Sequence, residues 1–234
     1  MVVRKLFLMG GIAAVSITAK TFVSLSGGKD SLIVLLLQGG AFWEKHLPAY
    51  LQPLNCYEMG RYETIVPDEH GNLDLKSALS ILRGATGILI GGGDTATYLR
   101  LYAQDSIRSL IHERYVEGVP VAGVSAGALI SQSACFFAGE DDREDIEARE
   151  GLGLLEDHLV CVHFSEQNGL PALMDTMANV KIRNGTGIDD TACAYFENGC
   201  FQSALGRFVY RVEMTDFETR SFILKKCKQT GALV

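Results

Sequence analysis

The sequence predicts an α/β fold in which a mostly parallel sheet carries helices on both faces. Short apolar runs, most of them bounded by glycine, alternate along the chain with segments whose apolar residues recur at helical spacing. The runs are apolar almost throughout, as expected of parallel strands that are buried on both faces. After Gly187 the pattern changes to short strand-like pieces separated by turns, which favours a C-terminal antiparallel β extension. Together these features predict a single layered α/β domain over residues 1–234.

The individual elements follow from these patterns in chain order. Parallel strands are expected at Lys5–Met9, Leu32–Leu37, Gly87–Ile90, Val119–Val124 and Leu159–Phe164. Helices are expected at Trp43–Leu51, Leu73–Leu82, Thr95–Tyr115 and Leu170–Ala178, with Asp94 capping the third. The antiparallel extension, which is expected to close the sheet, comprises Thr191–Phe196, Phe201–Leu205, Phe208–Glu213 and Ser221–Leu224. The acidic run Glu140–Glu150 is interpreted as a surface loop that runs into a helix.

Composition narrows the class of protein. The net charge of −7 and the lack of a basic stripe argue against a nucleic-acid partner. The six cysteines lack Cys-x-x-Cys spacing, so we expect neither a metal site nor a disulfide framework. An apolar stretch near the N-terminus is broken by Gly10-Gly11, which favours a strand and turn over a signal peptide. No apolar run is long enough to cross a membrane, and a cytoplasmic location is expected.

The segment Gly123-Val124-Ser125-Ala126-Gly127 carries the strongest functional signal. It stands where an apolar strand is followed by a helix, which is the setting of a nucleophile elbow. There the serine occupies a strained turn, and the flanking glycines leave room for the chain and for a substrate. Ser125 is therefore the candidate nucleophile.

Two further features are expected at the same carboxyl edge of the sheet. The loop Gly91-Gly92-Gly93-Asp94 follows a strand and opens a helix, so its backbone can approach a ligand, and we expect Gly92 and Asp94 to contact substrate. His163 ends another strand and is the candidate base that a serine nucleophile needs. The other histidines lie on expected helices, in a polar turn or before a strand: His46, His112, His70 and His158.

The acid that would orient His163 has two candidate sources. One is the loop that contains Glu140, Asp141 and Asp142, and the other is Asp189-Asp190 at the end of a strand near Ile188. The residues alone leave both open.

Four segments follow one another over most of the chain: Ile90–Thr95, Gly123–Ala128, Gly151–Leu155 leading to His163-Phe164, and Gly187–Ala192. Together, and in this order, they resemble peptidase family S51, which contains aspartyl dipeptidase (peptidase E) and cyanophycinase. The resemblance implies a fold similar to class I glutamine amidotransferases. It also implies a Ser125 nucleophile, a His163 base, an acid at Glu140 or Asp141, and an oxyanion hole formed by the N–H groups of Gly93 and Ala126.

The resemblance further implies hydrolysis of small peptides, including aspartyl or β-aspartyl ones, without a metal or other cofactor. Two departures bear on the substrate. Cys161 and Val162 precede His163 where cyanophycinases carry an acid and a glutamine, and Asp94 stands where peptidase E usually has asparagine. A small peptide is the expected partner, with no nucleic acid and no membrane, and a homodimer stays open.

Three alternatives compete with the peptidase. A non-catalytic binding or regulatory domain could share the fold. Ser26-Gly27-Gly28-Lys29-Asp30-Ser31 resembles the phosphate loop of PP-loop ATP pyrophosphatases, but a strand-length run follows it instead of the required helix. An α/β-hydrolase esterase would need a His-Gly-Gly oxyanion loop, and the sequence has none.

Overall fold

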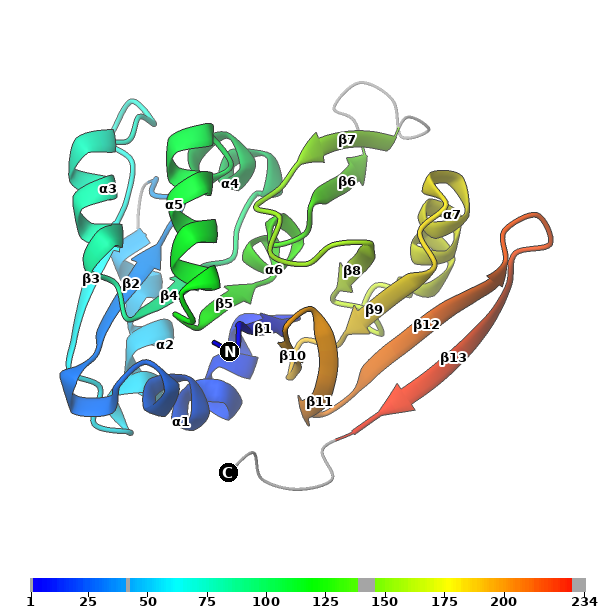
Figure 1. Cartoon of the computed structure of the whole chain (residues 1–234), viewed down its shortest axis with the longest axis horizontal. Helices are drawn as coiled ribbons and strands as arrows, with labels where there is room; N and C mark the ends of the chain where they lie inside the picture. Colours follow the sequence, from blue (N-terminus) through cyan, green and yellow to red (C-terminus); the bar gives the residue numbers. More distant parts are fainter. Residues whose placement is uncertain (1, 41–42, 139–145, 229–234) are drawn as a thin grey trace.

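The computed structural model describes residues 2–40, 43–138 and 146–228 of the chain. Within these ranges the largest sheet has seven strands in the order β11-β10-β1-β5-β4-β2-β3 (Figure 1). Five of them run parallel, and β10 and β11 are antiparallel at one edge. The strands are β1 (Lys5–Met9), β2 (Leu32–Leu36), β3 (Arg61–Ile65), β4 (Gly87–Ile90), β5 (Val121–Val124), β10 (Ala192–Glu197) and β11 (Cys200–Gly206). The predicted α/β class is confirmed.

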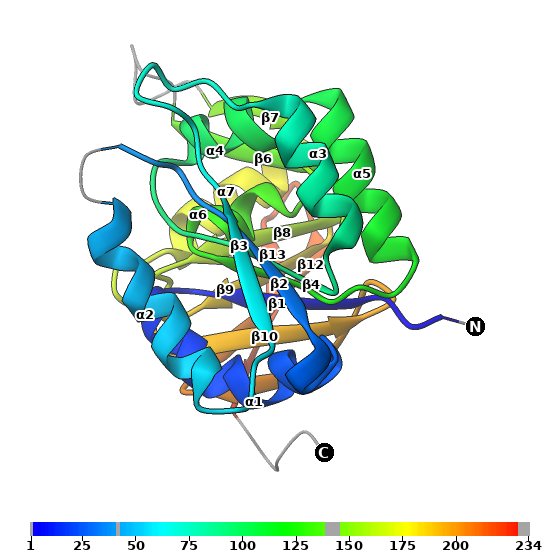
Figure 2. The same cartoon turned by 90° about the vertical axis from the view of Figure 1, so that its left-hand side faces the viewer.

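Helices cover both faces of this sheet, because successive side chains of each strand point to opposite sides. In β1, Phe7 and Met9 pack with the helices of one face, and Leu6 and Leu8 pack with those of the other. The first face carries α1 (Val15–Leu25) and α2 (Trp43–Asn55). The second face carries α3 (Leu75–Gly84), α4 (Thr95–Tyr102), α5 (Asp105–Val116) and α6 (Ala126–Ile130). Figures 1 and 2 show these two helical layers on either side of the strands.

A second, four-stranded sheet lies beside the first in the order β13-β12-β9-β8. Its strands are β8 (His158–Val162), β9 (Asn184–Ile188), β12 (Val209–Asp216) and β13 (Ser221–Cys227). β8 and β9 are parallel, and the remaining pairs are antiparallel. The helix α7 (Leu170–Val180) packs on it through Leu173 and Met177. A separate hairpin pairs β6 (Ala134–Ala138) with β7 (Ile146–Glu150).

Several predicted elements need correction. The expected helix Thr95–Tyr115 is two helices, α4 and α5, separated at Ala103-Gln104. The end of the acidic run Glu140–Glu150 forms the strand β7 and not a helix, because it pairs with β6. The run Leu159–Phe164 yields β8, which belongs to the second sheet. The C-terminal strands do not close one sheet: β10 and β11 join the first sheet, and β12 and β13 join the second.

The phosphate-loop-like segment agrees with its prediction. The segment Ser26–Ser31 forms the turn between α1 and β2, so a strand follows it as expected. All six cysteines lie in the described ranges and are unpaired. Among the helices of the described ranges, none combines the length and hydrophobicity needed to cross a bilayer. Four loops meet near the junction of the two sheets, after β4, β5, β8 and β9, and they carry the residues of the candidate site.

Candidate active site

Ser125 occupies a sharp turn between β5 and α6. Its backbone dihedrals are φ 49° and ψ −110°, a conformation that is costly for a residue with a side chain. Its N–H donates a hydrogen bond to Met9 O at 2.9 Å, which fixes the turn against the end of β1. The local geometry is therefore the nucleophile elbow that the sequence predicts.

The two glycines of the motif allow this turn to pack closely. A Cβ at Gly123 would lie 2.5 Å from Gly127 O, so any side chain there would clash with the start of α6. A Cβ at Gly127 would clash with Ile90 O at the end of β4. Close approach of the backbone thus explains why Ser125 is flanked by glycine at both positions.

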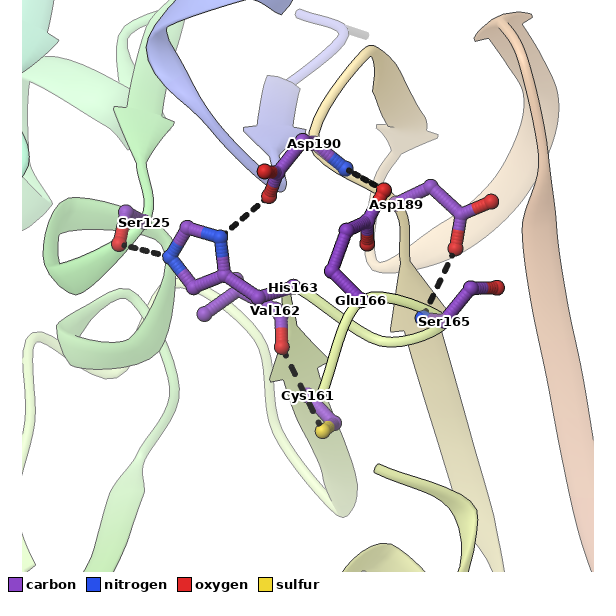
Figure 3. Close-up of polar contacts among 8 residues, drawn as sticks. All are labelled: Ser125, Cys161, Val162, His163, Ser165, Glu166, Asp189 and Asp190. Carbon is purple, nitrogen blue, oxygen red and sulfur yellow. Dashed lines mark hydrogen bonds and ion pairs between the residues drawn. The ribbon is translucent and has the colours of Figure 1, made fainter. Parts of the chain in front are cut away.

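The hydroxyl of Ser125 contacts His163, which in turn contacts Asp190 (Figure 3). Ser125 Oγ lies 2.9 Å from His163 Nε2, and Asp190 Oδ1 forms a hydrogen-bonded ion pair with His163 Nδ1. His163 also has a positive φ of 51°, at the turn that ends β8. Its side chain is 29% exposed, and that of Asp190 is 43% exposed, so the three groups lie at the mouth of a pocket and not in the core. The arrangement is a serine hydroxyl, an imidazole and a carboxylate in series.

The two loops that carry His163 and Asp190 are joined by reciprocal hydrogen bonds, which Figure 3 shows beside the triad. The N–H of Ser165 donates to Asp189 Oδ1 at 3.1 Å, and the N–H of Asp190 donates to Glu166 Oε1 at 3.3 Å. Asp189 is only 2% exposed, so its carboxylate is hydrogen-bonded within the protein and has little contact with solvent. These contacts hold the imidazole of His163 and the carboxylate of Asp190 at a fixed separation.

The glycine loop after β4 is held by side chains from α2, from α4 and from the segment after β2. The N–H of Gly92 donates to Tyr50 Oη at 2.9 Å, and Tyr98 Oη donates to Gly92 O at 3.3 Å. The N–H of Asp94 donates to Gln38 Oε1 at 2.6 Å. Burial raises the pKa of both tyrosines, so their hydroxyls stay neutral. Among the described residues, none accepts a hydrogen bond from the N–H of Gly93 or of Ala126.

A pocket of about 460 Å³ opens beside Ser125 and His163. This volume is within the usual range for small-molecule sites. It is lined mostly by apolar, aromatic and glycine residues: Gly11, Ile12, Leu37, Gln38, Gly39, Trp43, His46, Tyr50, Gly92, Gly93, Tyr98, Val124, Ser125 and His163.

The structure brings most, but not all, of the predicted site residues together. Ser125 and His163 are in contact, and Gly92 and Gly93 line the pocket. Asp94 does not line it: its carboxylate caps α4, where hydrogen bonds from the hydroxyl and N–H of Thr97 hold the pKa of Asp94 below its usual value. Glu140, Asp141 and Asp142 lie outside the described residues. Asp190, the alternative acid, is the carboxylate that contacts the imidazole.

Sequence reasoning missed the side chains that build the pocket wall and hold the glycine loop. These are Gln38, Trp43, Tyr50 and Tyr98. A signal was present for two of them, because Trp43 and Tyr50 are seven residues apart and so share one face of α2.

Within the described residues, no group of three or more His, Cys, Asp or Glu side chains is arranged to hold a metal ion.

Comparison with known proteins points to one family. The model of peptidase family S51 matches residues 65–204. Cyanophycinase from Synechococcus elongatus is 25% identical over 192 residues, which are 80% of this chain and 60% of that protein. The protein named uncharacterized peptidase YgaJ from Bacillus subtilis (strain 168) is 32% identical over 138 residues, which are 56% of this chain and 57% of that protein. The crystal structure of a peptidase from an acI-B1 actinobacterium superposes with a TM-score of 0.73 at 16% identity, over 98% of this chain and 96% of that one.

The structural likeness shows that the two proteins share a fold. The family model matches more than half of this chain in sequence. The chain spans about 60% of the length of two of the cyanophycinases it matches, so those proteins contain additional sequence outside the matched part.

Proposed function

Because the chain belongs to peptidase family S51, we propose that it is a serine-type peptidase acting on small peptides. One observation carries the proposal: the contact series from Ser125 Oγ through the ring of His163 to Asp190 beside a pocket of suitable size. A serine hydroxyl is a weak nucleophile unless a neighbouring base accepts its proton, and this arrangement supplies the base.

In the proposed acylation step, Ser125 Oγ attacks the carbonyl carbon of the scissile peptide bond and transfers its proton to His163 Nε2. Asp190 accepts a hydrogen bond from Nδ1–H, which holds the imidazole in the right tautomer and stabilises the imidazolium. His163 then gives the proton to the leaving amine, and the acyl group stays on Ser125 as an ester. Water hydrolyses the ester with His163 again acting as base, then as acid.

We assign the acid to Asp190 in place of Glu140 or Asp141, because the carboxylate of Asp190 is hydrogen-bonded to His163 Nδ1. We assign the oxyanion hole to the N–H groups of Gly93 and Ala126. Both groups lack an acceptor among the described residues, and the glycine loop lies next to Ser125, since a Cβ added at Gly92 would be 3.3 Å from Ser125 Cβ. Backbone donors that are already fixed stabilise the charge that develops on the carbonyl oxygen at little reorganisation cost.

The finer specificity stays a prediction. The preference for aspartyl or β-aspartyl peptides is implied by the family resemblance, but no Lys or Arg is among the described residues that line the pocket. The expected cytoplasmic location, the single domain and the lack of a nucleic-acid, membrane or cofactor partner are likewise predictions, and a homodimer stays open.

Labelling by a fluorophosphonate probe tests the proposal before any substrate is identified. The probe forms a bond between phosphorus and Ser125 Oγ and releases fluoride, so it reports an activated serine. We expect labelling of the native protein and of Ser106→Ala, which removes an exposed serine on α5, and none of Ser125→Ala. For a peptide that is cleaved, Ser125→Ala should reduce kcat on the order of 10⁶-fold.

Two outcomes would contradict the proposal. Equal labelling of Ser125→Ala would place the reactive serine elsewhere, and no labelling with no peptide turnover would favour a binding or regulatory role. ATP hydrolysis that survives Ser125→Ala and disappears in Asp30→Ala would instead favour the PP-loop alternative.

A further inference from the structure

The pocket beside Ser125 has no carboxylate, ammonium or guanidinium group in its described lining. None of its lining residues is Asp, Glu, Lys or Arg, and its wall is formed mainly by the apolar and aromatic side chains of Ile12, Leu37, Trp43, Tyr98 and Val124. Burying apolar groups against such a wall is favourable by about 25 cal/mol per Å², whereas burying an unpaired carboxylate costs several kcal/mol.

Three polar side-chain atoms of the wall already have partners within the protein. Tyr50 Oη accepts the N–H of Gly92, Tyr98 Oη donates to Gly92 O, and Gln38 Oε1 accepts the N–H of Asp94. These groups are used to hold the glycine loop, so they are poorly placed to compensate a buried charge on a ligand.

The charges next to the pocket have the wrong sign for an acidic substrate. A neighbouring pocket shares Gln38, Gly39 and Trp43 with the first and is lined by Asp68 and Glu69. The charged side chains that line this neighbouring pocket are therefore acidic, and like charges raise the free energy of a nearby carboxylate.

We propose that this pocket receives a neutral apolar or aromatic acyl group of the substrate, and that it discriminates against acidic ones. The inference rests on the proposed serine-peptidase function and departs from the aspartyl preference that the family resemblance implies. Trp43 and Ile12, at the wall and at the rim, are the specificity-determining residues. Ile12 is 39% exposed, so it lies where a longer side chain can be accommodated.

A pair of activated esters tests the inference. The p-nitrophenyl esters of 4-methylpentanoic acid and of succinic acid have acyl groups of nearly the same shape, which end in an isopropyl group and in a carboxylate. Ser125 Oγ would form an ester with either acyl group and release p-nitrophenolate, whose absorbance is followed. The comparison is made at pH 8, well above the usual imidazole range, because a histidine such as His46 is charged only when protonated. Ser125→Ala gives the background rate, which is subtracted for each ester and which for the succinyl ester includes release of p-nitrophenolate by attack of its own carboxylate on the ester carbonyl.

We expect kcat/KM to be about 100-fold higher for the 4-methylpentanoyl ester than for the succinyl ester. Trp43→Ala should lower kcat/KM for the neutral ester more than for the anionic one. Ile12→Lys should shift the ratio toward the succinyl ester by at least about tenfold, because it places a cation at the rim. Ile17→Lys, which adds the same charge at an exposed isoleucine of α1 outside the pocket lining, should leave the ratio close to that of the native protein.

The result that overturns the inference differs from the one that overturns the proposed function. If both esters react faster than with Ser125→Ala and the succinyl ester is hydrolysed as fast or faster, the neutral pocket is wrong and the serine hydrolase stands. If neither ester exceeds the Ser125→Ala background and the fluorophosphonate does not label the protein, the proposed function fails, and the inference that rests on it fails too.

Discussion

Asp190 is the residue on which the proposed chemistry depends most specifically. Its carboxylate contacts His163 Nδ1, while Ser125 Oγ contacts the opposite nitrogen of the ring. An asparagine at this position can present its amide N–H to the ring and stabilise the wrong tautomer. It also leaves an imidazolium without a counter-charge.

We expect Asp190→Asn to reduce kcat by about 10³- to 10⁴-fold with little change in KM, because the lost interaction is made mainly in the transition state. Steady-state kinetics on a cleaved peptide or ester measure this. Glu140→Gln and Asp141→Asn serve as comparison variants for the acid that the family resemblance implies, and each should retain most of the native kcat. A large loss in either of these, with Asp190→Asn close to native, would return the acid to the loop after the nucleophile helix.

At the scale of the elements, the glycine loop after β4 depends on helices from both faces of the sheet. Tyr50 reaches it from α2, and Tyr98 reaches it from α4. Together they bind the N–H and the carbonyl of Gly92, which fixes the orientation of the peptide planes on either side. This arrangement orients the N–H of Gly93, which has no acceptor among the described residues. Through the loop, α2 and α4 therefore position the donor that we assign to the oxyanion hole.

Tyr50→Phe should therefore lower kcat about tenfold while KM changes less, because the ring still lines the pocket and only the acceptor for Gly92 N–H is lost. Tyr62→Phe, which removes an exposed hydroxyl on β3, is the matched control and should behave as the native protein. The kinetic split between kcat and KM is the readout. A rise in KM at constant kcat would mean that Tyr50 contacts the substrate instead of positioning the loop.

At the scale of the whole molecule, the two sheets meet around His158. Its Nε2 lies 2.7 Å from Thr186 Oγ1 on β9, and its ring packs edge-on against Phe196 of β10, with ring centres 5.5 Å apart. Burial, assisted by the nearby positive charge of Arg211, lowers the pKa of His158 to about 4. The neutral imidazole is therefore part of the junction between the sheets.

This junction makes stability depend on pH. In the unfolded chain His158 takes up a proton near its ordinary pKa of about 6.5, whereas in the folded protein it does so only near 4. The unfolded state thus binds more protons between these values, and the free energy of unfolding should fall by up to about 3 kcal/mol as the pH drops from 6.5 to 4. Urea unfolding across this range measures the slope.

His158→Gln should flatten that slope even if it lowers stability at pH 7. His70→Gln, which removes a histidine whose side chain is 75% exposed, should leave the slope unchanged. Identical slopes for the native protein and His158→Gln would show that other groups cause the acid sensitivity.

The sequence was most informative where a single physical requirement dominates. β1 and β4 have the predicted bounds, because a strand buried on both faces needs a short, wholly apolar run. The elbow at Ser125 was also predictable, because only glycines permit the close contacts of Gly123 and Gly127. The strand β3 escaped prediction because it is an edge strand whose first residues are exposed, so it lacks an apolar run.

Features that depend on contacts between distant segments were harder to predict. The helix α1 is rich in β-branched residues and lacks a side-chain cap, so its local signal is weak, and burial of Phe22 and Val23 against the sheet stabilises it. The division between α4 and α5 does not interrupt the apolar spacing. The partner of His163 could not be chosen from the chain alone, because Asp190 reaches the imidazole only when β8 and β9 pair side by side.

The candidate site is divided between the two sheets. Ser125, the glycine loop and most of the pocket wall belong to the seven-stranded sheet and its helices, whereas His163 and Asp190 follow β8 and β9 of the four-stranded sheet. The base and the acid of the proposed mechanism thus come from a different sheet than the proposed nucleophile and most of the pocket wall. Substitutions confined to the ends of β8 and β9 would remove the base and the acid of the proposed mechanism and leave most of the pocket wall intact. The resulting protein would bind peptides without cleaving them. A receptor could descend from such an enzyme through a few substitutions, with its binding surface inherited nearly intact.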